Sequence, residues 1–330
     1  MNVGVEHYSI TISPEHLALL MELWVKAGFT FPHGVTDHAF IRLALEDLIS
    51  RGDLRTLREF LTRSGLQSTS EAFSAIFRMA ASLPASYDAA AFTARYDPDA
   101  DFDYIDGPTD AEALIVIFTG NAQRVGFPLP LVHGLFQAAG CPVLYLKDKT
   151  RNLFCDGLGD GGGRAALIGR IREKMDHAGI RRSILVGSSS GTYAALHYAR
   201  ALTASHVMGL AGPTRIDPTD TRPQIRGLRD RITAAGLPLD AMEGFGDGEA
   251  CCIRYYYGEE HPRDTDYARH LFRSGAGEAV AVRGHANHVV LEVISELGFF
   301  QADLAAAIAG GVFTDPSVYP ELIQPFEAAP

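Results

Sequence analysis

The apolar residues of the first 88 positions are spaced as in amphipathic helices. Ser13-Pro14-Glu15 has the order of a helix N-cap, a first-turn proline and a first-turn acid. Behind it, one helical stripe collects Leu17, Leu20, Met21, Trp24 and Val25. Further helical patterns cover residues 37–49, Leu54–Leu61 and Ser70–Leu83. We expect residues 1–88 to form a helical N-terminal region. It either packs against the rest of the chain or serves as a surface for a protein partner or for self-association.

From residue 92 onward, short apolar strands alternate with helices. Strands are predicted at residues 113–118, 142–147, 183–187, 206–211, 251–258 and 278–284. Helices are predicted at residues 130–140, 164–179, 192–202, 289–297 and 301–309. Strands that are apolar along their whole length and separated by helices indicate a mostly parallel sheet covered on both faces. The predicted fold class is therefore α/β, with residues 89–330 as the main domain.

One segment interrupts this alternation. Residues 212–249 are rich in acidic residues, proline and glycine and contain no clear apolar strand. We interpret the segment as a cap-like insertion over one end of the sheet.

Composition and charge exclude several classes of protein. The chain has 330 residues, 47% of them hydrophobic and 21% charged, and a net charge of −11, which argues against a nucleic-acid partner. No run approaches ~18 uninterrupted apolar residues, so no membrane span is expected. The first residues lack a basic segment followed by an apolar core, so no signal peptide is expected. The four cysteines have no metal-ligand spacing, and we expect free thiols, a cytoplasmic location, no metal and no cofactor.

Candidate chemistry begins at the sequence GSSSG, residues 187–191, which lies between a predicted strand and a predicted helix. The sequence fits the G-x-S-x-G pattern with Ser189 at its centre. In this pattern a sharp strand-to-helix turn exposes the central hydroxyl, and small flanking residues let the turn pack closely. Ser189 is therefore the candidate nucleophile, and Ser188 and Ser190 occupy the two variable positions.

A serine nucleophile needs a base, and the loop after the last predicted strand offers His285 and His288. We favour His288, because it adjoins the helix that follows, and keep His285 as the alternative. The acid comes between the serine and the histidine in chain order. Asp264 lies in an acidic, proline-containing stretch after the strand 251–258, and we expect it in a loop just before a helix. Asp217, after the strand 206–211, is the alternative, while Glu259 and Glu260 also remain possible.

Acyl transfer further requires donors for a developing oxyanion. One is expected from the backbone N–H of Ser190, the residue after the nucleophile. The loop after strand 113–118 supplies a second, because Gly120 allows close backbone approach and Asn121 would present its N–H.

Taken together, "VIFTGN", "LVGSSSGTYAAL", "YYYGEEHPRDTDYA" and "GHANH" resemble the α/β-hydrolase superfamily over roughly residues 92–309. The resemblance implies an eight-stranded, mainly parallel sheet with helices on both faces and a triad of Ser189, Asp264 and His288. Two positions depart from the pattern of many relatives. Thr192 replaces a second glycine after the elbow, and Thr119-Gly120 replaces a His-Gly pair.

The expected function is hydrolysis of an ester or related acyl bond in a small-molecule or acylated substrate, through an acyl-enzyme. An acyltransferase or thioesterase would use the same side chains. A non-catalytic scaffold that binds a partner through residues 1–88 is the alternative from a different class.

Overall fold

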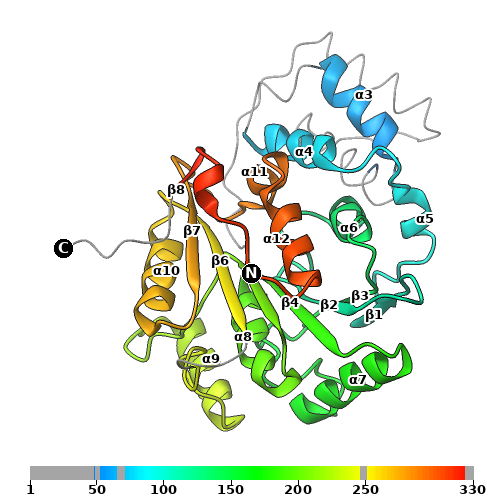
Figure 1. Cartoon of the computed structure of the whole chain (residues 1–330). Coiled ribbons are helices and arrows are strands. Elements are labelled where there is room, and N and C mark those ends of the chain that lie inside the picture. The colour runs from blue at the N-terminus through cyan, green and yellow to red at the C-terminus, as the bar shows by residue number, and fades with distance from the viewer. Residues whose placement is uncertain (1–47, 49–52, 65–70, 246–250, 324–330) are drawn as a thin grey trace, which may run out of the picture.

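The computed structural model describes Leu48 and residues 53–64, 71–245 and 251–323. Within them lies an eight-stranded sheet with the order β1-β3-β2-β4-β5-β6-β7-β8 (Figure 1). The strands are β1 Phe102–Ile105, β2 Ala113–Phe118, β3 Val143–Leu146, β4 Arg182–Ser188, β5 His206–Leu210, β6 Cys252–Gly258, β7 Glu278–Val282 and β8 Leu322–Ile323. The two edge pairs, β1 with β3 and β7 with β8, are antiparallel, and all other pairs are parallel. The mostly parallel α/β sheet predicted from the sequence is confirmed.

Helices cover both faces of this sheet because its central strands are apolar on both sides. In β2, Ile115 and Ile117 point into one core, whereas Leu114, Val116 and Phe118 point into the other. The first core is covered by α3 Leu54–Ser64, α4 Glu71–Ser82, α5 Ala89–Thr93, α6 Leu129–Gln137, α11 Leu291–Glu296 and α12 Phe299–Ile308. The second is covered by α7 Gly163–His177, α8 Ser190–Leu202, α9 Pro223–Ala234 and α10 Pro262–Ser274. The short 3-10 helix η2, Pro316–Val318, precedes β8.

The described part of the N-terminal region packs on the main domain. Leu54, Leu57 and Met79 belong to the same core as α6, α11 and α12. Arg78 of α4 lies 3.7 Å from carboxylate oxygens of both Glu292 and Glu296 on α11. The helices predicted at Leu54–Leu61 and Ser70–Leu83 are present as α3 and α4. The two predicted before them lie outside the described residues, apart from Leu48, which is helical.

The segment after β5 differs from the expected cap. Its described residues pack in the second core, where Ile216 and Ile232 meet α8 and α10. The Tyr193 hydroxyl of α8 donates to the Pro238 carbonyl at 2.6 Å, which fixes the segment beside the first turn of α8. The segment therefore lies along the α8 and α10 side of the sheet and contains a helix, α9, that sequence periodicity did not reveal.

No helix among the described residues has both the length and the apolar character needed to cross a membrane.

Candidate active site

Ser189 lies at the turn between β4 and α8. Its backbone has φ 52° and ψ −122°, a strained conformation for a residue with a side chain. The Ser189 N–H donates to the Leu210 carbonyl at 3.0 Å, and this bond holds the turn against the end of β5. A side chain on Gly191 would place its Cβ 2.0 Å from the Phe118 carbonyl oxygen, and one on Gly187 would lie 2.4 Å from the Cα of Thr192. The glycines of GSSSG are therefore required by close packing of the turn.

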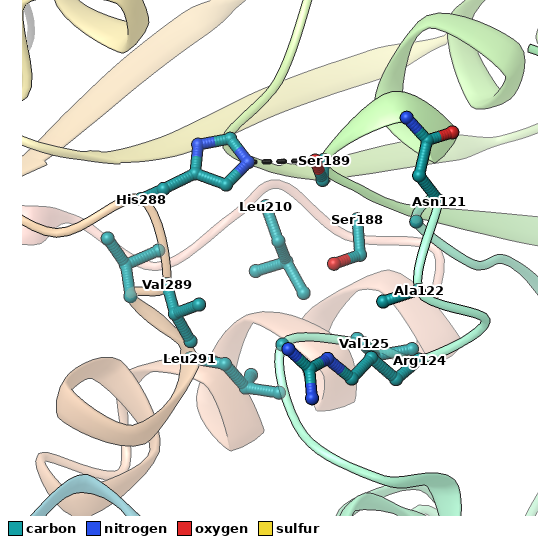
Figure 2. Close-up of a pocket in the computed structure, with 13 residues that line it drawn as sticks. Asn121, Ala122, Arg124, Val125, Ser188, Ser189, Leu210, His288, Val289 and Leu291 are labelled. Carbon is teal, nitrogen blue, oxygen red and sulfur yellow. Dashed lines mark hydrogen bonds between the residues drawn. The ribbon is translucent and has the colours of Figure 1, made fainter. Parts of the chain in front are cut away.

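His288 reaches Ser189 from the loop between β7 and α11. Its Nε2 lies 2.8 Å from the Ser189 Oγ. Figure 2 draws this hydrogen bond as a dashed line. His285 belongs to the same loop, but its Nε2 lies 2.7 Å from the Val289 carbonyl oxygen. Of the two candidate bases, His288 is the one that the structure brings to the serine.

Asp264 lies on the far side of the His288 ring. One of its carboxylate oxygens, Oδ2, is 2.7 Å from the His288 Nδ1, and Oδ1 accepts from the Gly212 N–H at 3.3 Å. The side chain is fully buried. The expectation that Asp264 precedes the helix was wrong by a few residues. The helix α10 begins at Pro262, so Asp264 is in its first turn.

The other candidate acids lie elsewhere. Asp217 is exposed and accepts from the backbone N–H and the hydroxyl of Thr219. Glu259 is exposed and accepts from the Gly284 N–H at 3.0 Å, and Glu260 is also exposed. None of the hydrogen bonds described for these three acids involves His288.

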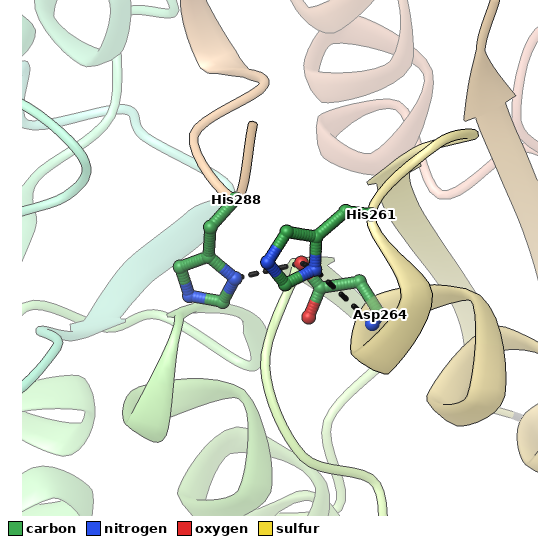
Figure 3. Close-up of side chains that lie close together, drawn as sticks. All are labelled: His261, Asp264 and His288. Atoms are coloured by element: carbon green, nitrogen blue, oxygen red, sulfur yellow. Dashed lines mark hydrogen bonds and ion pairs between the residues drawn. The ribbon is translucent and has the colours of Figure 1, made fainter. Parts of the chain in front are cut away.

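Sequence reasoning missed His261, which also contacts Asp264 (Figure 3). Its Nδ1 lies 2.7 Å from the same Asp264 oxygen that His288 contacts. Burial is the largest influence on His261 and lowers its pKa, although the charge of Asp264 opposes this shift. The available signal was Pro262, because proline favours the first helical position and so places the preceding histidine at the N-cap.

These three side chains are also of the types that bind metal ions. Among the described residues, His261, Asp264 and His288 are a set whose potential ligand atoms all lie within 4.8 Å of one another. Both histidine nitrogens lie at hydrogen-bonding distance, 2.7 Å, from the carboxylate oxygen. We interpret the set as hydrogen-bonded.

The two predicted oxyanion donors lie beside Ser189. Asn121 lines the same pocket as Ser189, on the loop after β2. Ser190 is the first residue of α8, where backbone N–H groups have no partner inside the helix. No protein acceptor within the described part of the chain bonds the N–H of Asn121 or of Ser190. Both donors are thus available to a bound group.

A pocket of about 200 Å³ opens at Ser189. Its lining is formed by Gly120, Asn121, Ala122, Arg124, Val125, Gly126, Ser188, Ser189, Leu210, His288, Val289, Val290 and Leu291. The loops after β2 and β7 supply most of these residues, and the described part of the insertion after β5, residues 212–245, supplies none. The walls are therefore largely apolar, with the Ser189 hydroxyl and the His288 ring on one side (Figure 2).

Comparison with known proteins gives similarity in structure alone. No family model and no curated protein matches the chain. A solved structure of 2,6-dihydroxy-pseudo-oxynicotine hydrolase is 13% identical, covers 92% of this chain and 95% of its own, and has a TM-score of 0.49. A carboxylesterase structure from Nitrososphaera gargenis is 13% identical over 64% and 97%, with a TM-score of 0.44. The capsule O-acetyltransferase of Neisseria meningitidis serogroup A is 14% identical over 62% and 90%, also at 0.44.

The class of fold follows from the chain's own architecture. The mostly parallel sheet with helices on both faces, the strand-turn-helix at Ser189, and the chain order Ser189, Asp264, His288 are those of the α/β-hydrolase fold. The protein has an α/β-hydrolase fold, and the resemblance seen in its sequence is confirmed at that level.

Proposed function

We propose that the protein is a serine hydrolase that cleaves an ester or related acyl bond through an acyl-enzyme. One observation carries the proposal. The His288 ring bridges the Ser189 hydroxyl and the buried Asp264 carboxylate, with contacts of 2.8 and 2.7 Å. A hydroxyl, an imidazole and a carboxylate in this order can generate an alkoxide-like nucleophile at neutral pH.

In the first half-reaction, the Ser189 Oγ attacks the substrate carbonyl while its proton passes to the His288 Nε2. Asp264 fixes the imidazole through Nδ1–H and stabilises its charged form. The backbone N–H groups of Asn121 and Ser190 donate to the oxygen that becomes negative. His288 then returns the proton to the leaving alcohol as the carbonyl re-forms, which leaves an acyl group on Ser189.

In the second half-reaction, His288 takes a proton from water, the resulting hydroxide attacks the acyl carbonyl, and the proton returns to Ser189 Oγ as the acid leaves. An alcohol or thiol in place of water would make the same protein an acyltransferase. Product analysis in the presence of added alcohols distinguishes transfer from hydrolysis.

Labelling with a fluorophosphonate probe tests the nucleophile. We expect the wild type to label and Ser189→Ala to lose labelling, while Ser274→Ala, on an exposed serine at the end of α10, labels like the wild type. A wild type that neither labels nor hydrolyses 4-nitrophenyl esters would instead favour the non-catalytic scaffold. Equal labelling of wild type and Ser189→Ala would assign the nucleophile elsewhere.

The two histidines of the loop after β7 provide a second test. We expect His288→Ala to lower kcat on the order of 10⁵- to 10⁶-fold, because the general base is lost. His285→Ala removes a contact with the Val289 carbonyl and is expected to lower kcat by no more than about tenfold, an upper bound for a misplacement that costs ~1.4 kcal/mol. Steady-state turnover of one ester measures both values of kcat. A larger loss of kcat in His285→Ala than in His288→Ala would make His285 the general base.

A further inference from the structure

Among the described residues that line the pocket at Ser189, one has a permanently charged side chain. These thirteen residues include Arg124 and no aspartate, glutamate or lysine. The chain as a whole carries a net charge of −11, so a cation beside a mostly apolar pocket is a local reversal of its charge. Figure 2 shows the Arg124 guanidinium extending toward Leu291. Both lie on the opposite side of the lining residues from Ser189 and His288.

Arg124 is tied by its backbone to the turn that carries Asn121. The Gly120 N–H donates to the Arg124 carbonyl at 3.0 Å, which closes this turn. Its side chain, however, is exposed and makes no ion pair or hydrogen bond with any residue that the structure describes. By contrast, Arg182 pairs with Glu112 and Arg254 with Asp303. A guanidinium held at a pocket without a counter-ion is suited to bind one that arrives with a ligand.

We propose that Arg124 binds an anionic oxygen group of the substrate, so that the acyl compound cleaved at Ser189 carries a carboxylate or phosphate. This inference rests on the proposed hydrolase function. The guanidinium can form two parallel N–H···O bonds with such a group, while Leu210, Val289 and Leu291 contact the apolar part between the anion and the reacting carbonyl. Because the site is open to solvent, the preference for an anionic over a neutral substrate is modest and weakens as the salt concentration rises.

Two matched pairs of esters test this substrate class. 4-Nitrophenyl hemiglutarate and 4-nitrophenyl valerate have acyl groups of equal length, and the first carries a carboxylate. 4-Acetoxybenzoate and 4-acetoxybenzamide place the charge on the leaving group instead. For at least one pair, we expect the ratio of kcat/KM for the anionic ester to that for the neutral ester to fall about fivefold in Arg124→Gln. The pair that responds identifies the side of the ester that carries the anion.

Arg124→Lys is expected to retain part of the preference for the anionic ester. Lysine keeps the positive charge, but it lacks the paired N–H donors of the guanidinium. Arg273→Gln makes the same charge change at an exposed arginine at the end of α10, outside the pocket, and should leave the ratio at the wild-type value. A ratio unaffected by Arg124→Gln, or lowered equally by Arg273→Gln, would overturn the role of Arg124 while leaving the hydrolase in place. Failure of the wild type to cleave any of the four esters or to label would overturn both.

A second, independent observation concerns the buried Asp264. Its Oδ2 has two imidazole neighbours, the Nδ1 of His288 and the Nδ1 of His261, each at 2.7 Å. The His261 Nδ1 also lies 3.3 Å from the Asp264 backbone nitrogen. A neutral ring nitrogen either donates or accepts, and the shorter contact with a carboxylate is the stronger one. We therefore assign the His261 Nδ1–H as a donor to Oδ2.

The geometry points to His261 as a positioning residue that shares the Asp264 carboxylate with His288. Two N–H donors on one oxygen spread its negative charge, so Asp264 stabilises the charged form of His288 less than it would alone. The titratable and charged groups around His261 are Asp264 and Arg263 on α10 and His288 and His285 on the loop after β7. This inference also rests on the proposed function, since it concerns the basicity of the proposed general base.

The pH dependence of kcat/KM tests the role of His261. His261→Ser keeps a residue that caps α10 and removes the ring donor. Because the neutral form of His288 is the active one, we expect the acidic limb of the profile to move to higher pH. His261→Gln, which restores an N–H donor, should move the limb back toward the wild type. If His261 acted only as the structural N-cap of α10, its substitution would change the free energy of unfolding and leave the acidic limb of the pH profile in place. An unmoved limb in His261→Ser, or the same limb in both variants, would overturn the proposal.

Discussion

The loops after β5 and β6 start from neighbouring parallel strands, yet they place their acidic residues in different environments. The loop after β6 leads directly into α10, and its first turn carries Asp264 into a fully buried position against His288. The loop after β5 turns at Gly212 beneath Ser189 and continues toward α9, so Asp217 is exposed and bonds Thr219 of its own loop. A carboxylate that follows one of these strands therefore does not necessarily reach the His288 imidazole. The direction in which the chain continues after the strand decides whether the carboxylate contacts the ring.

Among the predictions that compare these two loops, the largest effect is expected when Asp264 is exchanged for its amide. Asp264→Asn keeps the shape of the side chain but removes the charge that stabilises the His288 imidazolium and can favour the wrong tautomer. We expect kcat to fall on the order of 10⁴-fold. Steady-state ester hydrolysis and circular dichroism, which verifies folding, measure the effect.

Asp217→Asn is the matched control in the neighbouring loop. Its carboxylate is exposed, and its hydrogen bonds stay within residues 217–219. We expect ester turnover at the wild-type level. Loss of activity in Asp217→Asn with retention in Asp264→Asn would reverse the comparison and make the loop after β5 the source of the acid.

The fold was predictable wherever burial is complete. The strand β2 is buried at every residue and appears in the sequence as an unbroken apolar run. The strand β4 is buried at all but its first residue and appears as a shorter apolar run, residues 184–187, between two buried serines. The edge strands β1 and β8 were missed, because β1 has four residues and Asp103 interrupts its apolar positions, while β8 has only two residues. Strands this short are held by pairing with a neighbour and leave no periodicity of their own.

The candidate site was predictable to the extent that it depends on chain order. The elbow at Ser189 has a local pattern, whereas the choice between His285 and His288 depends on which way a loop turns after β7. The contact between His261 and Asp264 joins residues three apart at a helix start. The sequence pattern placed that start a few residues too late, so His261 was not recognised as the N-cap beside Asp264, although it lies within the quoted stretch YYYGEEHPRDTDYA.

Gly212 provides the next largest test, because it connects the two loops. Its φ is +88°, and a Cβ at this position would lie 1.9 Å from the Ser189 carbonyl oxygen. Gly236, after α9, has φ +68° and nothing within 4 Å of the added Cβ. We expect Gly236→Ala to cost about 1 kcal/mol of unfolding free energy and Gly212→Ala at least about 3 kcal/mol, since backbone must also shift. Urea unfolding measures both, and equal losses would mean that φ alone matters at Gly212.

The smallest effect is expected at Thr214, which joins the loop after β5 to the middle of α10. Its buried hydroxyl lies 2.9 Å from the His270 Nδ1 and 3.2 Å from the Tyr267 carbonyl oxygen, a second and longer acceptor for its one hydrogen. The His270 Nε2 lies 3.0 Å from an Asp240 oxygen. Since Nε2–H donates to Asp240, Nδ1 accepts from Thr214, and Thr214→Val leaves that nitrogen without its donor. We expect a loss of about 1–2 kcal/mol in urea unfolding. Thr233→Val, on an exposed face of α9, is the matched control and should cost less than ~0.5 kcal/mol. If the two losses are equal, the hydrogen bond to His270 does not stabilise the attachment of this loop, and its other contacts, including the apolar ones of Ile216 and Ile232, hold it in place.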